Sequence, residues 1–388
     1  MSQAAIRPVE SASGINIAPF LSGIEERAPE GTKARKLPSQ TIADFKEAGI
    51  FLSFLPKSLG GLGLEPQHFF KAQIEIAEAD MSSGWVAGII ACHAYQLALM
   101  DPQAQQDVYS SDPNTRISSS YNPVGGRVED APGKDGLMLS GRWAWSSGSD
   151  HCAWALLGGI VPGEGYRTFL VPREDYVIED TWFSMGLQGT GSNDVVIEKP
   201  VFVPHYRTHK QLDGFNCLHN ADDPLYSIPW AQIFIRIVST PAIGAVKKAL
   251  KLFTENASKS STDPTKLQSD PDILRRVAEV ENAVDVAETI LYRNFDALVD
   301  NARAGRETPM VDRIKFRYQA SIVIDNMIKA IDTLYEVAGG RSVYDGSPIQ
   351  KLWHDVHITR AHVANNPVPF ARNFGNVKMG GESTDYFV

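Results

Sequence analysis

The chain has little cysteine and no long uninterrupted apolar run. Its three cysteines, Cys92, Cys152 and Cys217, are odd in number and widely spaced among 388 residues, which predicts reduced thiols and argues against a disulfide framework or a zinc site. The longest apolar segment, residues 85–100, is shorter than the roughly 20 residues that a membrane helix needs, and we interpret it as a buried helix. The N-terminal residues lack a basic start followed by an apolar run, so we expect a cytoplasmic protein without a secretory signal or a membrane span.

The chain also has fewer basic than acidic residues. The formal net charge is −9, which makes nucleic acid or an anionic membrane surface a poor candidate for a partner. A dinucleotide fingerprint is missing too. Gly189 and Gly191 lack its third glycine, and residues 195–204 after them read as a strand, where a phosphate-binding loop needs a helix. We interpret residues 186–194 as a turn whose glycines let a cofactor approach closely.

What is present falls into three regions: residues 1–112, 113–210 and 211–388. The first region reads mostly as helices, and one helical pattern runs from residue 41 to Pro56. The second contains short segments rich in β-branched and aromatic residues, separated by glycine and proline, which predict strands. The third returns to helices, with Pro241 as an expected break and residues 271–338 as two long amphipathic helices. This order predicts an α+β fold, mostly α, with a β domain between two helical domains.

Aromatic and hydroxyl side chains crowd together in WAWSSGSDHCAW, residues 143–154. Trp143 and Trp145 alternate with an alanine, so we expect both indoles on the same side of a strand. Ser146 and Ser147 follow at once. Such a strand supplies a flat wall with hydrogen-bond donors at its rim, which suits a planar heterocycle. The alternative is a pair of core tryptophans capped by a serine turn.

Two further groups of polar side chains stand out. Three successive serines, residues 118–120, lie near a predicted strand and are interpreted as a solvated edge. His93 lies in the apolar segment, where a lone histidine is usually a hydrogen-bonded structural residue. Helical spacing places five apolar side chains on one stripe: Ile349, Leu352, Trp353, Val356 and Val363. His362 falls near the opposite side and faces solvent, a polar pocket or another subunit. His354 and His357 lack the second carboxylate cluster that would support a metal site.

These pieces, in this order, resemble a known family. A helical N-terminal domain, a central β-barrel or sandwich domain and a C-terminal four-helix bundle form the acyl-CoA dehydrogenase arrangement. The chain is more closely similar to the flavin-dependent monooxygenases built on that fold, the oxygenase components of two-component aromatic hydroxylases. These include 4-hydroxyphenylacetate 3-hydroxylase, steroid-ring phenol hydroxylases and indole oxygenases. The resemblance covers nearly the whole chain and rests on FLPKSLGGLGL, SSGWV, TRISSSYNP, WSSGSDH, GTGSND with VFVP, IPW, and PIQKLWHDVHITRAHVANNP.

The resemblance implies a cofactor, a reaction and partners. Reduced flavin, with FADH2 favoured over FMNH2, would react with the co-substrate O2 to give a C4a-hydroperoxyflavin, which oxygenates an electron-rich phenolic or indolic substrate. A separate NAD(P)H-dependent flavin reductase would supply the reduced flavin, because the chain has no nicotinamide fingerprint. Families of this kind are usually homotetramers, and the long amphipathic helices fit that expectation.

The resemblance also implies the site residues. Ser146 or Ser147 would stand near flavin N5, His362 would act as base toward the substrate's OH or NH, and His93 would orient the substrate or the peroxide. The catalytic set is His93, Ser146, Ser147 and His362. The cofactor-binding set is Ser118, Ser119, Ser120, Trp145, Ser146, Ser147, Thr190, Gly191 and Ser192. The substrate-binding set is His93, Tyr95, Tyr121, Trp230 and His362, with part of the pocket expected from residues 209–230 and no metal ligand expected.

A true acyl-CoA dehydrogenase is the alternative function. Such an enzyme needs a carboxylate base to remove the α-proton of the thioester, and many members place a glutamate for this in the C-terminal domain. Between Val337 and Gly381 this chain has no glutamate, and histidines occur there instead. An imidazole near neutral pKa suits a phenol or an indole better, so the absence favours the oxygenase.

Overall fold

The computed structural model describes residues 14–210, 223–259, 268–385 and 387–388. From residue 14 onward, five α-helices precede the strands: α1 (Leu21–Ala34), α2 (Ser39–Glu47), α3 (Pro66–Ala79), α4 (Met81–Ala98) and α5 (Pro102–Tyr109). The helix expected to reach Pro56 instead ends at Glu47, and this expectation was wrong. Gly49 follows with φ 81°, a left-handed conformation that stops the helix, and a short 3₁₀ helix at Ile50–Leu52 replaces it.

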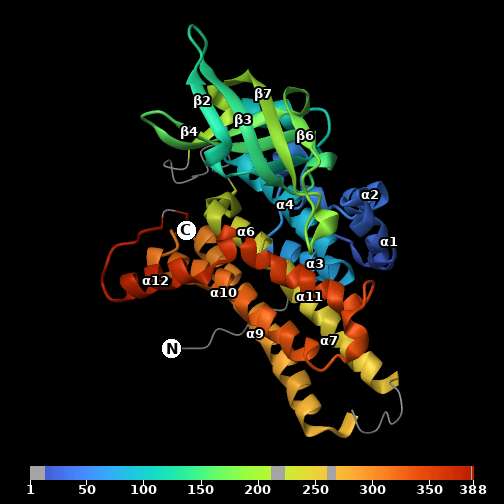
Figure 1. Ribbon diagram of the computed structural model, residues 1–388. Coiled ribbons are helices and arrows are strands. Elements are labelled where there is room, and N and C mark those ends of the chain that lie inside the picture. The colour runs from blue at the N-terminus through green and yellow to red at the C-terminus, as the bar shows by residue number, and fades with distance from the viewer. Residues whose placement is uncertain (1–13, 211–222, 260–267, 386) are drawn as a thin grey trace.

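The strands form two four-stranded sheets that pack face to face (Figure 1). One sheet has the order β1-β4-β5-β8: Ile117–Ser120, Trp154–Val161, Gly165–Pro172 and Thr208–Lys210. The other has the order β2-β3-β7-β6: Gly126–Asp130, Gly136–Ser146, Asn193–Pro204 and Val177–Glu179. Side chains from both sheets share one apolar core, in which Leu139 and Trp143 of β3 meet Leu157 of β4 and Phe169 of β5. The central β sandwich is therefore confirmed.

Among the described residues after the sandwich there are six α-helices: α6 (Trp230–Ile237), α7 (Pro241–Lys259), α9 (Pro271–Arg303), α10 (Met310–Tyr335), α11 (Pro348–Ile358) and α12 (Pro367–Lys378). The helices α7, α9, α10 and α11 pack against one another as the expected four-helix bundle. The break at Pro241 separates α6 from α7, as its missing N–H predicts. The fold class is confirmed, while the boundaries 1–112, 113–210 and 211–388 stay a prediction. No helix within the described residues is long and apolar enough to cross a membrane.

Helix α4 links the sandwich to the bundle, and it is buried along its whole length. It packs on β1 at one side and on α3, α6 and α7 at others (Figure 1). The sequence allows this because Gly84 leaves room for the backbone of Ala77, and Gly88 leaves room for the side chains of Gln73 and Ile237. Asp80 caps the helix by accepting a hydrogen bond from the N–H of Ser83 at 2.8 Å. The buried helix predicted for residues 85–100 is confirmed, and it carries His93 to the underside of the sandwich.

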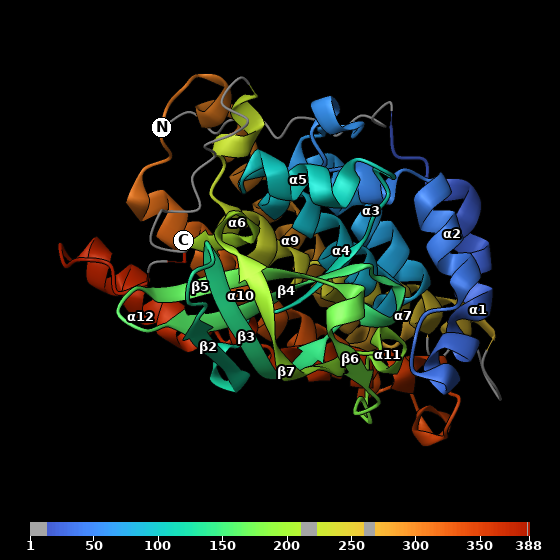
Figure 2. The same cartoon turned by 90° about the horizontal axis from the view of Figure 1, so that it is seen from above.

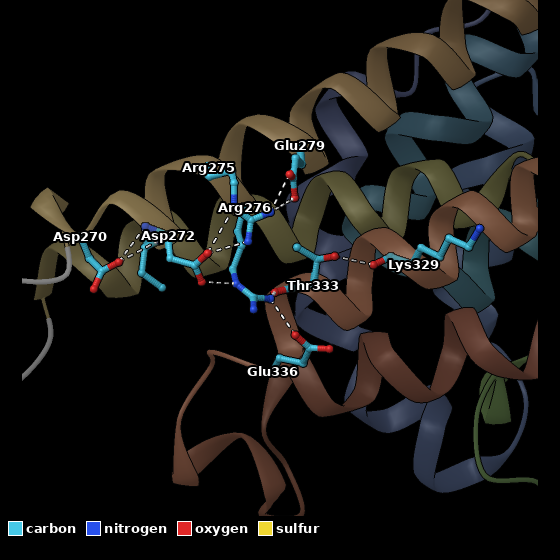
Figure 3. Close-up of polar contacts among 9 residues, drawn as sticks. Asp270, Asp272, Arg275, Arg276, Glu279, Lys329, Thr333 and Glu336 are labelled. Atoms are coloured by element: carbon cyan, nitrogen blue, oxygen red, sulfur yellow. Dashed lines mark hydrogen bonds and ion pairs between the residues drawn. The ribbon is translucent and has the colours of Figure 1, made fainter.

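One ion pair and one hydrogen bond join Arg276 of α9 to the end of α10 (Figure 3). Asp270 caps α9 by accepting from the N–H groups of Asp272 and Ile273. Arg276 donates to the carbonyl oxygen of Thr333 at 2.9 Å and to a carboxylate oxygen of Glu336 at 2.7 Å. The side chain of Glu336 is 64% exposed, so this ion pair contributes little to stability. From above, the strands lie over the helices, and α1 and α2 flank them at one side (Figure 2).

The crossing of α3 and α7 depends on a glycine. A Cβ atom at Gly244 would lie 2.4 Å from the carbonyl oxygen of Ile74 and 2.8 Å from Cβ of Ala77. We expect Gly244→Ala to push the helices apart and to lower the free energy of unfolding by about 2 kcal/mol, visible as a lower melting temperature. Gly375→Ala is the control, because Gly375 lies in α12 with nothing within 4 Å of the added atom. Equal melting temperatures for the two variants would contradict this prediction.

Candidate active site

The two tryptophans of β3 do not share a wall, contrary to expectation. The side chain of Trp143 is 1% exposed in the sandwich core, whereas that of Trp145 is 64% exposed. The ladder between β3 and β7 shifts register between Trp143 and Ser146, and Trp145 has φ 67°. This bulge breaks the two-residue alternation on which the expectation relied. Trp143 is thus a core residue, as the alternative interpretation had it, and Trp145 alone offers an accessible indole.

A connected row of hydroxyl groups begins where β3 ends. The Oγ atom of Ser147 accepts a hydrogen bond from Nε1 of Trp85 at 3.1 Å and lies 2.7 Å from Oγ of Ser192. Ser192 in turn lies 2.7 Å from Oγ1 of Thr190, which donates to the carbonyl oxygen of Leu187 at 2.8 Å. Two segments about 45 residues apart in the chain, both with residues in the predicted cofactor-binding set, are therefore joined at one place.

The loop after Gly186 is a turn, as the sequence predicts. It contains a short 3₁₀ helix, Gln188–Thr190, flanked by left-handed residues at Leu187 (φ 49°) and Gly191 (φ 53°), and it leads into strand β7. Strand β7, and not a helix, follows the loop, as the sequence predicts. A Cβ atom at Gly189 would lie 3.1 Å from Cβ of Ser82, which shows how closely this loop approaches the start of α4.

The serine run forms β1 and is buried, so the solvated-edge interpretation was wrong. β1 is the edge strand of its sheet, but α4 packs over it. The hydroxyl of Ser120 donates to the carbonyl oxygen of Ala144 in β3 at 2.7 Å, and that of Ser118 contacts the carbonyl oxygen of Trp154 at 3.5 Å. Ser119 lies between them and is also buried. The serines therefore occupy the junction of both sheets with α4, beside the end of β3.

These residues fit a planar flavin ring with polar edges. The hydroxyls of Ser146 and Ser82 are buried without a hydrogen-bond partner, which leaves spare donors and acceptors around the end of β3 and the start of α4. Trp145 adds an accessible aromatic face, and the glycines of the loop keep side-chain bulk away from the backbone N–H groups. A ring nitrogen or oxygen placed here would meet hydroxyl groups rather than bare apolar surface.

His93 is held as a neutral imidazole with one free nitrogen. Its Nδ1 lies 2.9 Å from the carbonyl oxygen of Ile117, so Nδ1 carries the proton and donates. Burial lowers the pKa of His93 to about 4, and Nε2 is buried with no partner. A neutral imidazole protonated at Nδ1 presents a lone pair at Nε2. His93 can therefore accept a hydrogen bond from a substrate hydroxyl or N–H.

The buried imidazole makes stability depend on pH. The folded state holds His93 with a pKa of about 4 against an ordinary 6.5, so the unfolded state binds more protons between these values and stability falls as the pH falls. His93→Asn preserves a donor to Ile117 but does not titrate. We expect the wild type to lose about 2 kcal/mol relative to this variant between pH 7 and pH 5. Thermal melts at both pH values test this, and parallel melting curves would contradict it.

His362 offers the opposite hydrogen-bonding pattern. Helix α11 ends at Ile358, before the stripe that was expected to reach Val363, and Val363 is 79% exposed. His362 lies between two short 3₁₀ turns, where its Nδ1 accepts from the N–H of Ala364 at 3.2 Å. Burial and the charge of Arg317 lower its pKa to about 4, so it is neutral near pH 7. A neutral ring that accepts at Nδ1 carries its proton at Nε2 and can donate there.

Aromatic rings connect the two histidines. Phe234 of α6 lies 6.2 Å from the His362 ring and 5.1 Å from Tyr121, and Tyr121 lies 6.0 Å from His93. Trp230, one turn before Phe234, lies 6.5 Å from His93. The predicted substrate-binding residues His93, Tyr121, Trp230 and His362 are thus brought together. These distances join ring centroids. They show that the rings contact one another in series and form a continuous apolar wall.

Tyr95 belongs to the same cluster but its hydroxyl is occupied. It donates toward the carbonyl oxygens of Leu225 and Ile228 at 2.7 and 2.6 Å, and its ring stacks on Tyr226 at 5.1 Å. Tyr95 therefore holds the segment before α6 in place. Of the loop 209–230, residues 211–222 lie outside the described residues, and Cys217 is among them.

Sequence reasoning missed several residues of this site. Trp85 lies in the quoted SSGWV segment but received no role, although its indole N–H contacts Ser147. Phe234 follows Trp230 by four residues, and this helical spacing was the available signal. Asp355 gave no local signal, because its partner, the N–H of Leu187 at 2.6 Å, is 168 residues away. Within the described residues, no group of three or more His, Cys, Asp and Glu side chains could hold a metal ion.

Comparisons with known proteins identify the family. The family model described as acyl-CoA dehydrogenase, C-terminal domain, matches residues 236–367. The chain is 37% identical to the oxygenase subunit HsaA of a flavin-dependent monooxygenase from Rhodococcus jostii strain RHA1, over 95% of this chain and 98% of that protein. It is 30% identical to the oxygenase component of the FADH2-dependent resorcinol hydroxylase of Rhizobium sp. strain MTP-10005, over 97% of each chain.

A solved structure agrees with the sequence relatives. The crystal structure of the 3-HSA hydroxylase from Rhodococcus sp. RHA1 superposes with a TM-score of 0.90 at 35% identity, covering 96% of this chain and 97% of that one. The relatives are monooxygenases rather than dehydrogenases, and their names as oxygenase components imply a separate reductase component. This chain belongs to the flavin-dependent monooxygenases of acyl-CoA dehydrogenase fold, the oxygenase components of two-component aromatic hydroxylases.

Proposed function

We propose that this chain hydroxylates an electron-rich phenol, using reduced flavin and O2. The observation that carries the proposal is the free Nε2 atom of His93, a buried acceptor beside the aromatic rings of Tyr121 and Trp230. A phenol hydroxyl bonded to this atom has more electron density on its ring, which favours attack by the ring carbon on an electrophilic oxygen. The row of hydroxyls from Ser147 to Thr190 is the proposed flavin side of the site.

Bound reduced flavin would supply the activation of O2 and the transfer of one oxygen atom to the substrate. The chain's own residues bind the ring, position the substrate and exclude water, which otherwise favours loss of hydrogen peroxide. Ser146, Ser147 and Trp145 would hold the ring, with the serines of β1 at its edge. The aromatic wall excludes water from the substrate side.

The tautomers favour a division of roles opposite to the one implied by the resemblance. His93 presents a lone pair at Nε2 and is proposed to accept a hydrogen bond from the substrate hydroxyl. His362 accepts at Nδ1, so its Nε2–H is proposed to donate toward the substrate or the transferred oxygen. Both rings are neutral near pH 7, because burial lowers both pKa values to about 4.

A phenol is proposed over an indole because a relative of this chain is named for resorcinol, which is a phenol. An indole N–H could also bond to His93, so parallel turnover of phenols and indoles distinguishes the two substrate classes.

FAD is proposed over FMN, since the resorcinol relative is named as FADH2-dependent. A separate NAD(P)H-dependent reductase is proposed to supply it, in keeping with the relatives' names as oxygenase components. Titration of the protein with reduced FAD and reduced FMN under nitrogen compares the two dissociation constants. Tighter binding of FMN would overturn the cofactor choice without affecting the reaction type.

A homotetramer is the proposed assembly. Tyr344, Val363 and Met379 expose apolar side chains in the C-terminal part of the chain, which supports their burial between subunits. Light scattering on a sizing column is expected to give four times the mass of one chain. A monomer mass would contradict this assembly.

Stopped-flow absorbance tests the proposed function. Protein loaded with chemically reduced FAD is mixed with oxygenated buffer, with and without a panel of phenols. We expect an absorbing intermediate to form as the reduced flavin is oxidised, and to last far longer than with free FAD. When a phenol is present, a hydroxylated phenol should then be formed. Immediate oxidation without a transient, together with bleaching of bound oxidised FAD by an acyl-CoA, would favour the dehydrogenase instead.

A further inference from the structure

The turn that carries His362 is tied to α10 through one peptide group. The carbonyl oxygen of this peptide, that of Ala364, accepts from Oγ of Ser321 at 2.7 Å and from Nη1 of Arg317 at 3.0 Å. Its N–H, that of Asn365, donates to the backbone carbonyl oxygen of His362 at 2.9 Å. The N–H of Ala364 donates to Nδ1 of the His362 ring at 3.2 Å. The residues that contact His362 are therefore the ones that α10 holds.

Arg317 is needed for both of the bonds from α10. The hydroxyl of Ser321 has one proton and two acceptors within reach, the carbonyl oxygen of Ala364 at 2.7 Å and that of Arg317 at 3.1 Å. Nη1 of Arg317 donates to Oγ of Ser321 at 2.7 Å, so the guanidinium and the hydroxyl converge on Ala364. Without the guanidinium, the hydroxyl can turn to the carbonyl oxygen of its own helix, as serines in helices do. Ala364 would then lose both donors.

The charge of Arg317 is buried and held in one place. Its side chain lies between α10 and α12, with Cζ 3.3 Å from the centroid of the Phe370 ring. Nε lies 3.9 Å from Oδ2 of Asp385, near the C-terminus of the chain. Burial lowers the pKa of Arg317 to about 9, so it stays charged near pH 7. After burial, this charge is the second reason that the His362 ring stays neutral.

We propose that Arg317 is a positioning residue for hydroxylation: it holds the turn 362–365 so that Nδ1 of His362 accepts from Ala364 and its Nε2–H is free to donate. The inference rests on the proposed function, because it takes His362 as a donor toward the substrate or the transferred oxygen. It deepens that function by adding a residue of the helical bundle that acts through His362 and not on the substrate.

The Arg317→Met variant is expected to keep its fold. Asn365 pins the turn independently of Arg317, because its Nδ2 donates to the carbonyl oxygens of Val238 at 3.1 Å and Thr359 at 2.9 Å. Methionine is unbranched and apolar, so it can fill the same space beside the Phe370 ring. The variant therefore removes the hydrogen bonds to Ala364 rather than the packing, and far-ultraviolet circular dichroism and a thermal melt check that it folds.

Single turnovers with reduced FAD and a phenol test the proposal. Arg317→Met should lower the fraction of flavin oxidation that yields hydroxylated phenol by about tenfold or more, the worth of a hydrogen bond from a charged group. The rest of the oxygen should appear as hydrogen peroxide. Arg317→Lys can still donate to Ala364 and should restore part of the product. A wild-type fraction of product in Arg317→Met would overturn the inference.

A double-mutant cycle asks whether Arg317 acts through His362. His362→Asn has already lost the donor at the position of Nε2, so adding Arg317→Met should change the product fraction little, because residues that act as a unit are not additive. An equal loss on adding Arg317→Met to the wild type and to His362→Asn would show two independent effects and would overturn the inference.

Two control variants guard against a merely structural effect. Arg276→Met removes an arginine that also donates to a backbone carbonyl oxygen of α10, that of Thr333 at 2.9 Å, about four turns from Arg317. Asp385→Asn removes the charge beside Arg317 but leaves its bonds to Ala364 intact. Both should keep the wild-type fraction of product even where the melting temperature falls. A loss in either control as large as that in Arg317→Met would overturn the inference.

Crystal structures of the wild type and of Arg317→Met separate this inference from the proposed function. We expect the His362 ring of the variant to leave the N–H of Ala364. A ring that stays in place would overturn the inference, whichever reaction the protein catalyses. A displaced ring, in a protein whose wild type hydroxylates no phenol or indole, would overturn the proposed function and support the positioning role.

Discussion

Hydroxylation by the His93→Asn variant is expected to fall by about 100-fold or more, while oxidation of the reduced flavin continues and releases hydrogen peroxide. Asparagine can still donate to the carbonyl oxygen of Ile117, as Nδ1 of His93 does at 2.9 Å, but it lacks the acceptor at Nε2. The substrate hydroxyl then has no partner to draw its proton away. Product and peroxide are measured in the same single-turnover reaction.

His362 provides the matched comparison. His362→Gln keeps a side-chain N–H near the position of Nε2, whereas His362→Asn keeps an acceptor for the N–H of Ala364 and loses that donor. We expect the glutamine variant to retain more hydroxylation than the asparagine variant. If the asparagine variant retains more hydroxylation than the glutamine variant, or if His93→Asn hydroxylates as the wild type does, His362 rather than His93 acts on the substrate hydroxyl.

A second large effect is expected at Asp355. Asp355→Ala leaves the N–H of Leu187 without its acceptor and removes one of the two carboxylates that hold Lys351. The burial of this group makes the loss costly, and we expect a decrease of about 3 kcal/mol in the free energy of unfolding. Because Leu187 then moves, reduced FAD should also bind more weakly. Thermal melts and anaerobic titrations measure the two effects.

Asp355→Asn is the control for the anchor. Its amide oxygen can still accept from Leu187, and Lys351 keeps Asp80 as a partner at 3.1 Å. We expect this variant to lose less stability than Asp355→Ala and to bind reduced FAD nearly as the wild type does. If both variants lose the same stability and the same affinity for reduced FAD, the charge of Asp355, and not its hydrogen bond to Leu187, holds the loop around Leu187 in place.

Much of the fold was predictable because its signals are local. The apolar run at residues 85–100 predicts a buried helix, and α4 is buried throughout. Pro241 predicts a break, and α6 and α7 meet there. The exceptions have specific causes. Gly49 ends a helix whose apolar pattern continues past it, and the packing of α4 over β1 buries a run of serines that looked like an exposed edge.

The sequence predicted which residues gather at the site better than it predicted how they are arranged. The resemblance drew attention to His93, Ser147 and His362, and the structure gathers residues of these segments around the end of β3 and the start of α6. Periodicity could not anticipate the bulge at Trp145, because one extra residue reverses the alternation. It also could not give the tautomers, which depend on the carbonyl of Ile117 and the N–H of Ala364.

A single turnover under ¹⁸O2 tests the central claim most directly. The protein is loaded with chemically reduced FAD, supplied with a phenol and exposed to ¹⁸O2, and the product is analysed by mass spectrometry. The account predicts a hydroxylated phenol that carries one ¹⁸O atom, with much less of it from His93→Asn. Full oxidation of the flavin with no ¹⁸O in any phenol or indole of the panel would contradict it.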